Sequence, residues 1–275
     1  MKVSPGCDHC YAERSTPART MGIVWGPGEA RRLTSDDNWR KPRQWDKAHA
    51  EFFAQHGRRR RVFCASLADI FDNQVPEEFR TRLWRLIAET PHLDWLLLTK
   101  RIGNALDMLP AFWCLGPTEL HGWHAEFKHV TLGISAVNQA ELDRDLPKLF
   151  DVPAVRYFVS MEPLLGPAKL GAVWFRHNRA QGGLDWVIVG GESGPGARPM
   201  HPAWVRSLRD QCAAEGVSFF FKQWGEWAHV GASGAGSAGE VHKMDDDCWV
   251  WRVGKKAAGC RLDGIEHKAW PEDDC

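Results

Sequence analysis

The sequence lacks any excess of charge of one sign. Its 275 residues include 35 Lys and Arg against 35 Asp and Glu, so the formal net charge is zero. Proteins that bind nucleic acid usually carry an overall or clustered basic excess that displaces counterions from phosphates. The composition therefore excludes a generally basic nucleic-acid-binding protein, and such a contact would need a local patch. The arginine run Arg58–Arg61 is one candidate, although such runs are more often solvated helix ends.

The sequence also lacks a long apolar segment. No run approaches the roughly 18 to 20 apolar residues that span a bilayer, and the N-terminal MKVSPGCDHCYAERS has no apolar signal-peptide core. We therefore expect a cytoplasmic protein with no membrane segment. In a reducing compartment, eight cysteines at irregular spacing do not predict a disulfide framework. Metal ligation or simple burial is the expected role of these cysteines.

Hydrophobic residues make up 44% of the chain, which is enough for a substantial core. In most of the chain, short apolar and β-rich runs alternate with longer amphipathic stretches. The near-continuous apolar character of these runs is typical of strands that are covered on both faces. The runs are Arg61–Ser66, Asp94–Thr99, His129–Ser135, Val155–Ser160, Asp185–Gly190 and Val217–Lys222.

Helical patterns lie between the predicted strands. One starts near Pro76 and stops before Pro91, and His201–Glu215 has the same plan. A weaker helical pattern covers Asn138–Phe150, where we expect Pro147 to interrupt the helix. Strand–helix–strand units of this kind build a parallel sheet with right-handed crossovers.

Six strands are too few for a closed eight-stranded barrel, so the alternatives are a partial (β/α)6 TIM-like barrel and an open doubly wound sheet. Polar or ionisable residues follow every strand, and in a barrel the C-terminal strand ends converge on one mouth where substrate binds. We therefore expect an α/β partial barrel of parallel strands over residues 1–227. Residues 228–275 are expected to be a flexible linker, rich in small residues at 231–239, and an irregular C-terminal appendage that packs on the barrel.

A CxxC motif lies near the start of the chain, where Cys7 and Cys10 flank Asp8 and His9 and precede Tyr11. Two thiolates at this spacing can bind one metal centre, as they do in zinc knuckles and iron–sulfur sites, and the same spacing occurs in redox pairs. The motif alone leaves these alternatives open. Cys7 and Cys10 are the predicted metal ligands.

Six motifs in order resemble a phage-associated family of uncharacterised three-Cys-motif proteins, which is itself similar to the radical S-adenosylmethionine superfamily. They are VSPGCDHCYAER, LLLTKR, TLGISAVNQ, FVSMEPLLGP, DWVIVGGESGPGARPM and FFFKQWG. The resemblance implies a 4Fe–4S cluster on the CxxC loop above a partial barrel, with Tyr11 beside it and S-adenosylmethionine as cofactor. It also implies a third cysteine immediately before Met1. The first strand is therefore expected to be truncated, through a late start or in an inactive copy.

The segment 185–198 is the second strong feature. Gly190 and Gly191 at a strand end let the backbone approach a ligand closely, Glu192 supplies a carboxylate for an ammonium or a ribose hydroxyl, and Arg198 offers paired donors to a carboxylate or phosphate. The resemblance implies that the Gly-Gly-Glu triplet contacts the methionine amino group of the cofactor. The alternative is a tight turn in which the glycines serve steric needs only.

Three ionisable residues at strand ends are the predicted catalytic residues. Lys100 can hold an anionic group, and its alternative is a solvent-exposed helix start. Glu162 is placed where a barrel-rim carboxylate would be, and structural and functional roles are both open for it. Lys222 follows the aromatic Phe219–Phe221 and would otherwise have to pair or extend to solvent.

The resemblance implies a radical S-adenosylmethionine-like iron–sulfur enzyme of unknown substrate, in which the cofactor carries the difficult chemistry. A nucleotide or nucleic-acid substrate, and a partner protein, are expected only by analogy with the phage association. The alternatives are a zinc-binding or metal-free structural or interaction protein, and an inactive truncated copy that lacks the third cluster cysteine.

Overall fold

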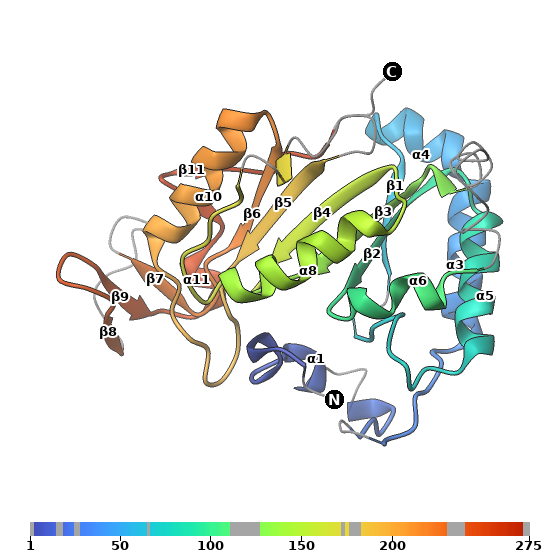
Figure 1. Cartoon of the computed structure of the whole chain (residues 1–275), viewed down its shortest axis with the longest axis horizontal. Coiled ribbons are helices and arrows are strands. Elements are labelled where there is room, and N and C mark those ends of the chain that lie inside the picture. The colour runs from blue at the N-terminus through green and yellow to red at the C-terminus, as the bar shows by residue number, and fades with distance from the viewer. Residues whose placement is uncertain are drawn as a thin grey trace.

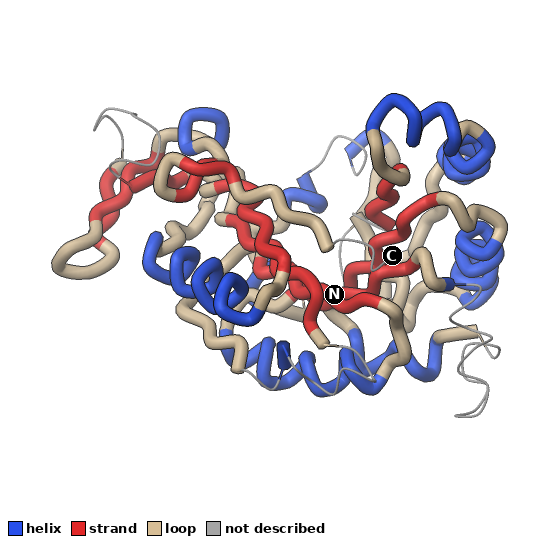
Figure 2. Tube along the Cα trace, turned by 90° about the horizontal axis from the view of Figure 1, so that it is seen from above, coloured by secondary structure: helices blue, strands red, loops and turns tan. Residues whose placement is uncertain are grey.

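The computed structural model describes residues 3–14, 19–24, 28–64, 67–110, 127–171, 174–175, 183–229 and 240–271. Six parallel strands form one sheet in the order β1-β2-β3-β4-β5-β6, so each strand pairs with the next along the chain. The strands are β1 (Arg60–Cys64), β2 (Leu93–Thr99), β3 (Val130–Ser135), β4 (Arg156–Met161), β5 (Leu184–Gly190) and β6 (Ser218–Gln223). The sheet is curled into a half-barrel with the helices outside the curve (Figure 2). The predicted α/β partial barrel of parallel strands is confirmed.

The longer helices cover the convex side of the sheet (Figure 1). They are α3 (Asp36–Lys47), α4 (His49–His56), α5 (Glu77–Ala88), α8 (Gln139–Asp151) and α10 (Pro202–Glu215), and the short η2 (Ile102–Asn104) and α6 (Ala105–Met108) follow β2. The helices predicted after Pro76 and after His201 are confirmed. The expected interruption at Pro147 is wrong, because α8 runs through it. Pro147 lies on the exposed face of α8, where a carbonyl that loses its N–H partner can bind water.

Side chains alternate between the two faces of the sheet. Leu97, Leu132 and Val159 belong to the main core between the sheet and the helices. The concave face carries a smaller cluster, which consists of Leu96, Phe158, Trp186 and Ile188 with Leu98, Phe220 and Trp270 packed against it. Both faces of the central strands are therefore apolar, as their near-continuous apolar sequences predict.

β1 is one of the two edge strands of the sheet, and it is more exposed than the other, β6. None of its residues is buried, and the Phe63 side chain is 45% exposed. The expectation that all six strands are covered on both faces is therefore wrong for β1. It has a neighbouring strand on one side only, whereas the C-terminal segment hydrogen-bonds along the other edge strand, β6.

A second, antiparallel sheet has the order β7-β9-β8, with β7 (Trp227–His229), β8 (Val241–Lys243) and β9 (Trp249–Arg252). Because β7 starts at Trp227, this sheet includes the predicted domain boundary. The predicted linker at 231–239 lies outside the described residues. No described helix has both the length and the apolar character needed to cross a membrane.

The chain then returns to the barrel through α11 (Lys255–Ala258) and the hairpin of β10 (Arg261–Leu262) and β11 (Ile265–Glu266). After the hairpin, the carbonyl of His267 accepts a hydrogen bond from the Phe221 backbone N–H of β6 at 2.9 Å. The Trp186 indole donates to the carbonyl of Ala269 at 3.0 Å. The C-terminal segment thus lies along the outer edge of β6 and reaches the concave face.

Candidate functional site

The CxxC loop lies at the C-terminal ends of the barrel strands. It begins with the 3-10 helix η1 (Pro5–Cys7), capped by Ser4, whose hydroxyl accepts from the Gly6 N–H at 3.1 Å. Gly6 is buried, and a Cβ atom there would be 2.6 Å from Val137 Cγ1 and 3.3 Å from Pro163 Cδ. These two contacts come from the segments after β3 and β4, so only glycine allows the loop to sit this close to the rim of the sheet.

Glu192, directly after β5, holds the CxxC loop together with Arg198. The Glu192 side chain is 5% exposed. Its Oε2 atom accepts from the Arg198 backbone N–H and from Nε, both at 2.8 Å, and its Oε1 atom accepts from Arg198 Nη2 at 2.7 Å. His9 Nδ1 lies 3.3 Å from the same Oε2 atom. We call Glu192, Arg198 and His9 the loop clamp.

Arg198 also contacts the backbone and a side chain of the CxxC loop. Its Nη2 atom donates to the Pro5 carbonyl at 2.8 Å, and Nη1 lies 3.5 Å from the Asp8 carboxylate. Burial favours a raised pKa for Glu192, but the hydrogen bonds from Arg198 and His9 outweigh it and hold that pKa below its usual value. The hydrogen bond to Glu192 in turn raises the pKa of Arg198. Both groups are therefore charged, and their described contacts position the loop.

The two glycines before Glu192 have steric reasons for being glycine. A Cβ atom on Gly190 would lie 3.1 to 3.3 Å from the Glu162 carboxyl group. On Gly191 it would lie 1.8 Å from the Trp224 carbonyl oxygen, which no side-chain movement relieves. These contacts fit the alternative in which the two glycines serve steric needs only. They lie where the ends of β4, β5 and β6 meet.

Glu162 and Lys222 form an ion pair across the ends of β4 and β6. Lys222 Nζ lies 2.8 Å from Glu162 Oε2, and Gln223 Nε2 donates to Glu162 Oε1 at 3.3 Å and to Ser193 Oγ at 3.1 Å. Two of the three predicted catalytic residues are therefore in direct contact. Lys222 both pairs with Glu162 and extends to solvent, which are the two structural alternatives to a functional role that its sequence position leaves open.

Lys100, at the end of β2, contacts a different neighbour. Its Nζ atom donates to Ser135 Oγ, at the end of β3, at 2.6 Å. The Asp69 carboxylate accepts from the Lys100 backbone N–H at 2.9 Å and from the Thr99 hydroxyl at 2.7 Å. The polar rim thus has two separate parts, one around Lys100 and one around Glu162 and Lys222.

Cys7 and Cys10 are both partly exposed free thiols. Tyr11 begins the short helix α1 (Tyr11–Arg14), but its side chain lies outside the described part of the structure. Over the described ranges, no three His, Cys, Asp or Glu side chains are grouped so that they could hold a metal ion. The described residues therefore bring two thiolates, and no complete ligand set, to the predicted metal site.

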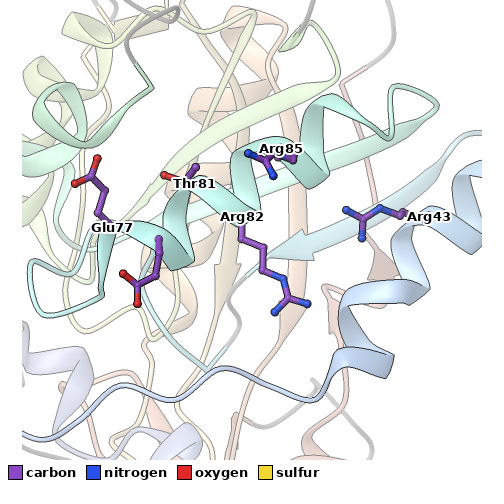
Figure 3. A pocket seen from close by; sticks show the side chains of 6 residues that line it. Arg43, Glu77, Thr81, Arg82 and Arg85 are labelled. Atoms are coloured by element: carbon purple, nitrogen blue, oxygen red, sulfur yellow. The ribbon is translucent and has the colours of Figure 1, made fainter.

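A groove with a volume of about 740 Å³ lies elsewhere, between α3 and α5, and is lined by Arg43, Glu77, Glu78, Thr81, Arg82 and Arg85 (Figure 3). Two of its guanidinium groups already have carboxylate partners, since Arg43 pairs with Glu89 and Arg82 pairs with Asp36. The groove is on the outer helices, and none of the predicted site residues lines it.

A family model described as a protein of unknown function, DUF5131, matches residues 1–271. The chain belongs to the DUF5131 family. No curated protein and no solved structure matches the chain. The match includes residues 228–271, so the DUF5131 model covers the C-terminal segment that packs on β6 as well as the barrel.

Sequence reasoning missed three parts of this DUF5131 site. The CxxC motif assigns no partner to His9, and the structure places its Nδ1 atom 3.3 Å from Glu192 Oε2. Ser135 ends a predicted strand, but its contact with Lys100, like that of Gly6 with Val137, depends on residues that are distant in sequence. The only local signal was the Ser4-Pro5-Gly6 turn before the motif, which predicts a tight start to the loop.

Proposed function

We propose that this DUF5131 protein is a radical S-adenosylmethionine-like iron–sulfur enzyme in which Cys7 and Cys10 are two of the ligands of a 4Fe–4S cluster. The main support is the position of the CxxC loop, which lies at the C-terminal ends of the strands of a half-barrel, where (β/α) barrels bind substrate. Tight contacts of Gly6 and the loop clamp keep it there.

The fit of the described residues to a cluster is partial. A 4Fe–4S cluster with one open iron needs three thiolates, and the described residues supply two. The proposal therefore requires a third ligand from outside the described ranges. It also places the protein in a reducing, cytoplasmic setting, because both thiols must stay reduced to bind metal.

The roles that follow for the chain's own residues are positional. Glu192 and Arg198 orient the loop, while Gly190 leaves room for the Glu162 carboxylate beside the end of β5. Glu162 and Lys222 are the proposed catalytic pair. The Glu162 carboxylate can accept a proton, the Lys222 ammonium can donate one, and Lys222 Nζ lies 2.8 Å from Glu162 Oε2. A nucleotide or nucleic-acid substrate, phage-related modification and a partner protein complete the proposal by analogy alone.

The test is metal content after anaerobic purification and reconstitution with iron and sulfide. We expect iron and sulfide to bind to the wild type with the absorbance and electron paramagnetic resonance of a 4Fe–4S cluster, and S-adenosylmethionine to alter that resonance. Cys7→Ser and Cys10→Ser should each abolish iron binding. Cys260→Ser is the control: it removes a partly exposed free thiol from the C-terminal segment and should leave iron binding unchanged.

Stoichiometric zinc without iron, lost in the same two variants, would overturn this proposal and support the zinc-binding alternative. One observation favours a metal-free structural role as a second candidate: protein contacts of Gly6, Glu192 and Arg198 fix the position of the loop. That candidate, or an inactive copy, predicts that neither metal binds and that Cys7→Ser leaves stability unchanged.

A further inference from the structure

The strongest unexplained feature is the Lys100 ammonium group. Lys100 follows β2 directly and shares a face with Leu96 and Leu98, which belong to the concave cluster. Its Nζ atom reaches Ser135 Oγ at 2.6 Å, and Ser135 is only 4% exposed. Lys100 itself is partly exposed. Its charge therefore lies at the concave side of the rim, next to a buried hydroxyl.

The two carboxylates of the segment after β1 are engaged with other groups. Asp69 accepts from the Thr99 hydroxyl and the Lys100 backbone, and its Oδ2 atom lies 3.4 Å from Arg101 Nη1. Asp72 lies 2.9 Å from Arg31 Nη2 and 3.7 Å from Arg101 Nη2. The two arginines match these two carboxylates, and within the described ranges Lys100 forms no ion pair.

The other lysine of the rim provides a comparison. Lys222 is balanced by Glu162 at 2.8 Å, so this pair adds no net charge. Lys100 adds one positive charge, and an ammonium group has three donors, of which Ser135 takes one. The Ser135 hydroxyl accepts from Lys100, so its own hydrogen is available to a second acceptor. The two side chains together offer donors of the kind that carboxylate and phosphate groups accept.

We propose that Lys100 and Ser135 form a binding subsite for an anionic group, a carboxylate or a phosphate, of a small molecule that lies against the concave face of the sheet. The role of this subsite in catalysis rests on the proposed function, but its affinity for an anion does not. The anion can belong to a substrate or to the carboxylate of S-adenosylmethionine, and both sources have the same chemistry.

The experiment is isothermal titration calorimetry on the full chain without added iron, at constant ionic strength. The probes are inorganic phosphate, acetate and S-adenosylmethionine. Lys100→Met keeps the length of the side chain and removes its charge, and we expect at least about a ten-fold loss of affinity for the probe that binds. Ser135→Ala should cause a smaller loss of affinity, and Lys100→Arg, which keeps the positive charge, should retain most of the affinity of the wild type.

Lys169→Met is the matched control, because Lys169 is exposed and its removal changes the net charge equally.

Binding of phosphate or acetate that depends on Lys100 supports a substrate anion, and binding of S-adenosylmethionine alone supports the cofactor carboxylate. The proposal is overturned if no probe binds saturably to the wild type, or if Lys100→Met and Lys169→Met lose affinity equally. Circular dichroism verifies that each variant is folded. Failure of iron binding in the earlier test leaves these outcomes unchanged.

Discussion

The two ends of the curled sheet are covered by different segments and by different interactions (Figure 1). At the C-terminal ends of the strands, the CxxC loop is held by charged groups, with Glu192 accepting several hydrogen bonds from Arg198. On the concave face toward the other end, the C-terminal segment is held by packing of Trp270 and by main-chain hydrogen bonds. Charge-assisted hydrogen bonds fix direction, whereas apolar packing contributes stability without direction. Both regions contain hydrogen bonds, but the loop with the thiols depends on a buried ion pair, whereas the C-terminal segment adds apolar packing of Trp270.

Trp270 is the centre of the second region. Its ring lies 4.5 Å from the Trp186 ring of β5, and the Arg61 guanidinium of β1 lies 3.5 Å from its centroid. One side chain therefore contacts strands from both sides of the curl. This contact makes the C-terminal segment part of the barrel's packing, although its sequence has no clear period.

The largest expected effect is the loss of stability in Trp270→Ala. Since Trp270 is half-buried, we expect a decrease of about 2 to 3 kcal/mol in the free energy of unfolding, below the range for a fully buried tryptophan. Urea unfolding followed by circular dichroism measures it. Trp249→Ala is the control, because Trp249 is 47% exposed on β9 and should cost under about 1 kcal/mol. Equal losses in the two variants would show that the C-terminal segment does not support the sheet.

For Glu192→Gln we expect a smaller loss of stability but a larger increase in the exposure of the CxxC loop. Removing the charge breaks the buried ion pair of Arg198 and leaves only the longer one with the exposed Asp8 among its described contacts, so we expect a cost of about 1 to 2 kcal/mol. Alkylation of Cys7 and Cys10 by iodoacetamide, followed by mass spectrometry, should become several-fold faster because the loop is released.

Two internal comparisons sharpen this prediction. Cys212 should stay unlabelled in the folded protein, because burial raises the pKa of its thiol to about 12. Glu240→Gln, which removes an exposed carboxylate, should not change the alkylation rates. If Trp270→Ala accelerates alkylation of the two loop cysteines as much as Glu192→Gln, the two regions are coupled and the contrast between them fails.

The smallest effect concerns Asp263, which tests whether the C-terminal segment also depends on charge. Asp263 lies 2.7 Å from Arg206 Nη2 and 2.8 Å from Arg209 Nη1, and the hydrogen bond from Arg206 is the largest of several effects that lower its pKa to about 2. Because the folded-state pKa is lowered, the stabilisation is complete above the unfolded pKa of about 4 and disappears as the pH falls toward 2.

Asp263→Asn should therefore lower stability by about 1 kcal/mol at pH 7, given solvent screening of this partly exposed carboxylate. The difference from the wild type should shrink as the pH falls through the folded-state pKa of about 2 and vanish below it. Asn is the suitable replacement because Asp263 has a φ of 53° in the two-residue turn of the β10–β11 hairpin, and Asn tolerates that conformation. Urea unfolding at a series of pH values measures the difference, and a difference independent of pH would exclude the charge as its cause.

Much of the barrel could be predicted from sequence because each strand and helix has its own local pattern. The apolar run of β5 and the polar Glu192 after it place that carboxylate at the rim without any tertiary information. The partner of Glu192 could not be predicted, since Arg198 and His9 reach it only when the loop and the sheet meet. The predicted interruption at Pro147 was wrong for a related reason, because the effect of a proline on α8 depends on which side of the helix faces solvent.

The sequence by itself indicated the six strands, the class of the fold and the polar residues that follow the strands, because hydrophobic periodicity is a local property and chain direction limits a parallel sheet to few arrangements. Only the tertiary structure decided which rim charges neutralise one another. It paired Glu192 with Arg198 and Glu162 with Lys222, and it left Lys100 beside Ser135. The physical reason is that an ion pair depends on distances of a few ångströms between strand ends, and these distances are set by the curl of the sheet and by glycines such as Gly190 and Gly191.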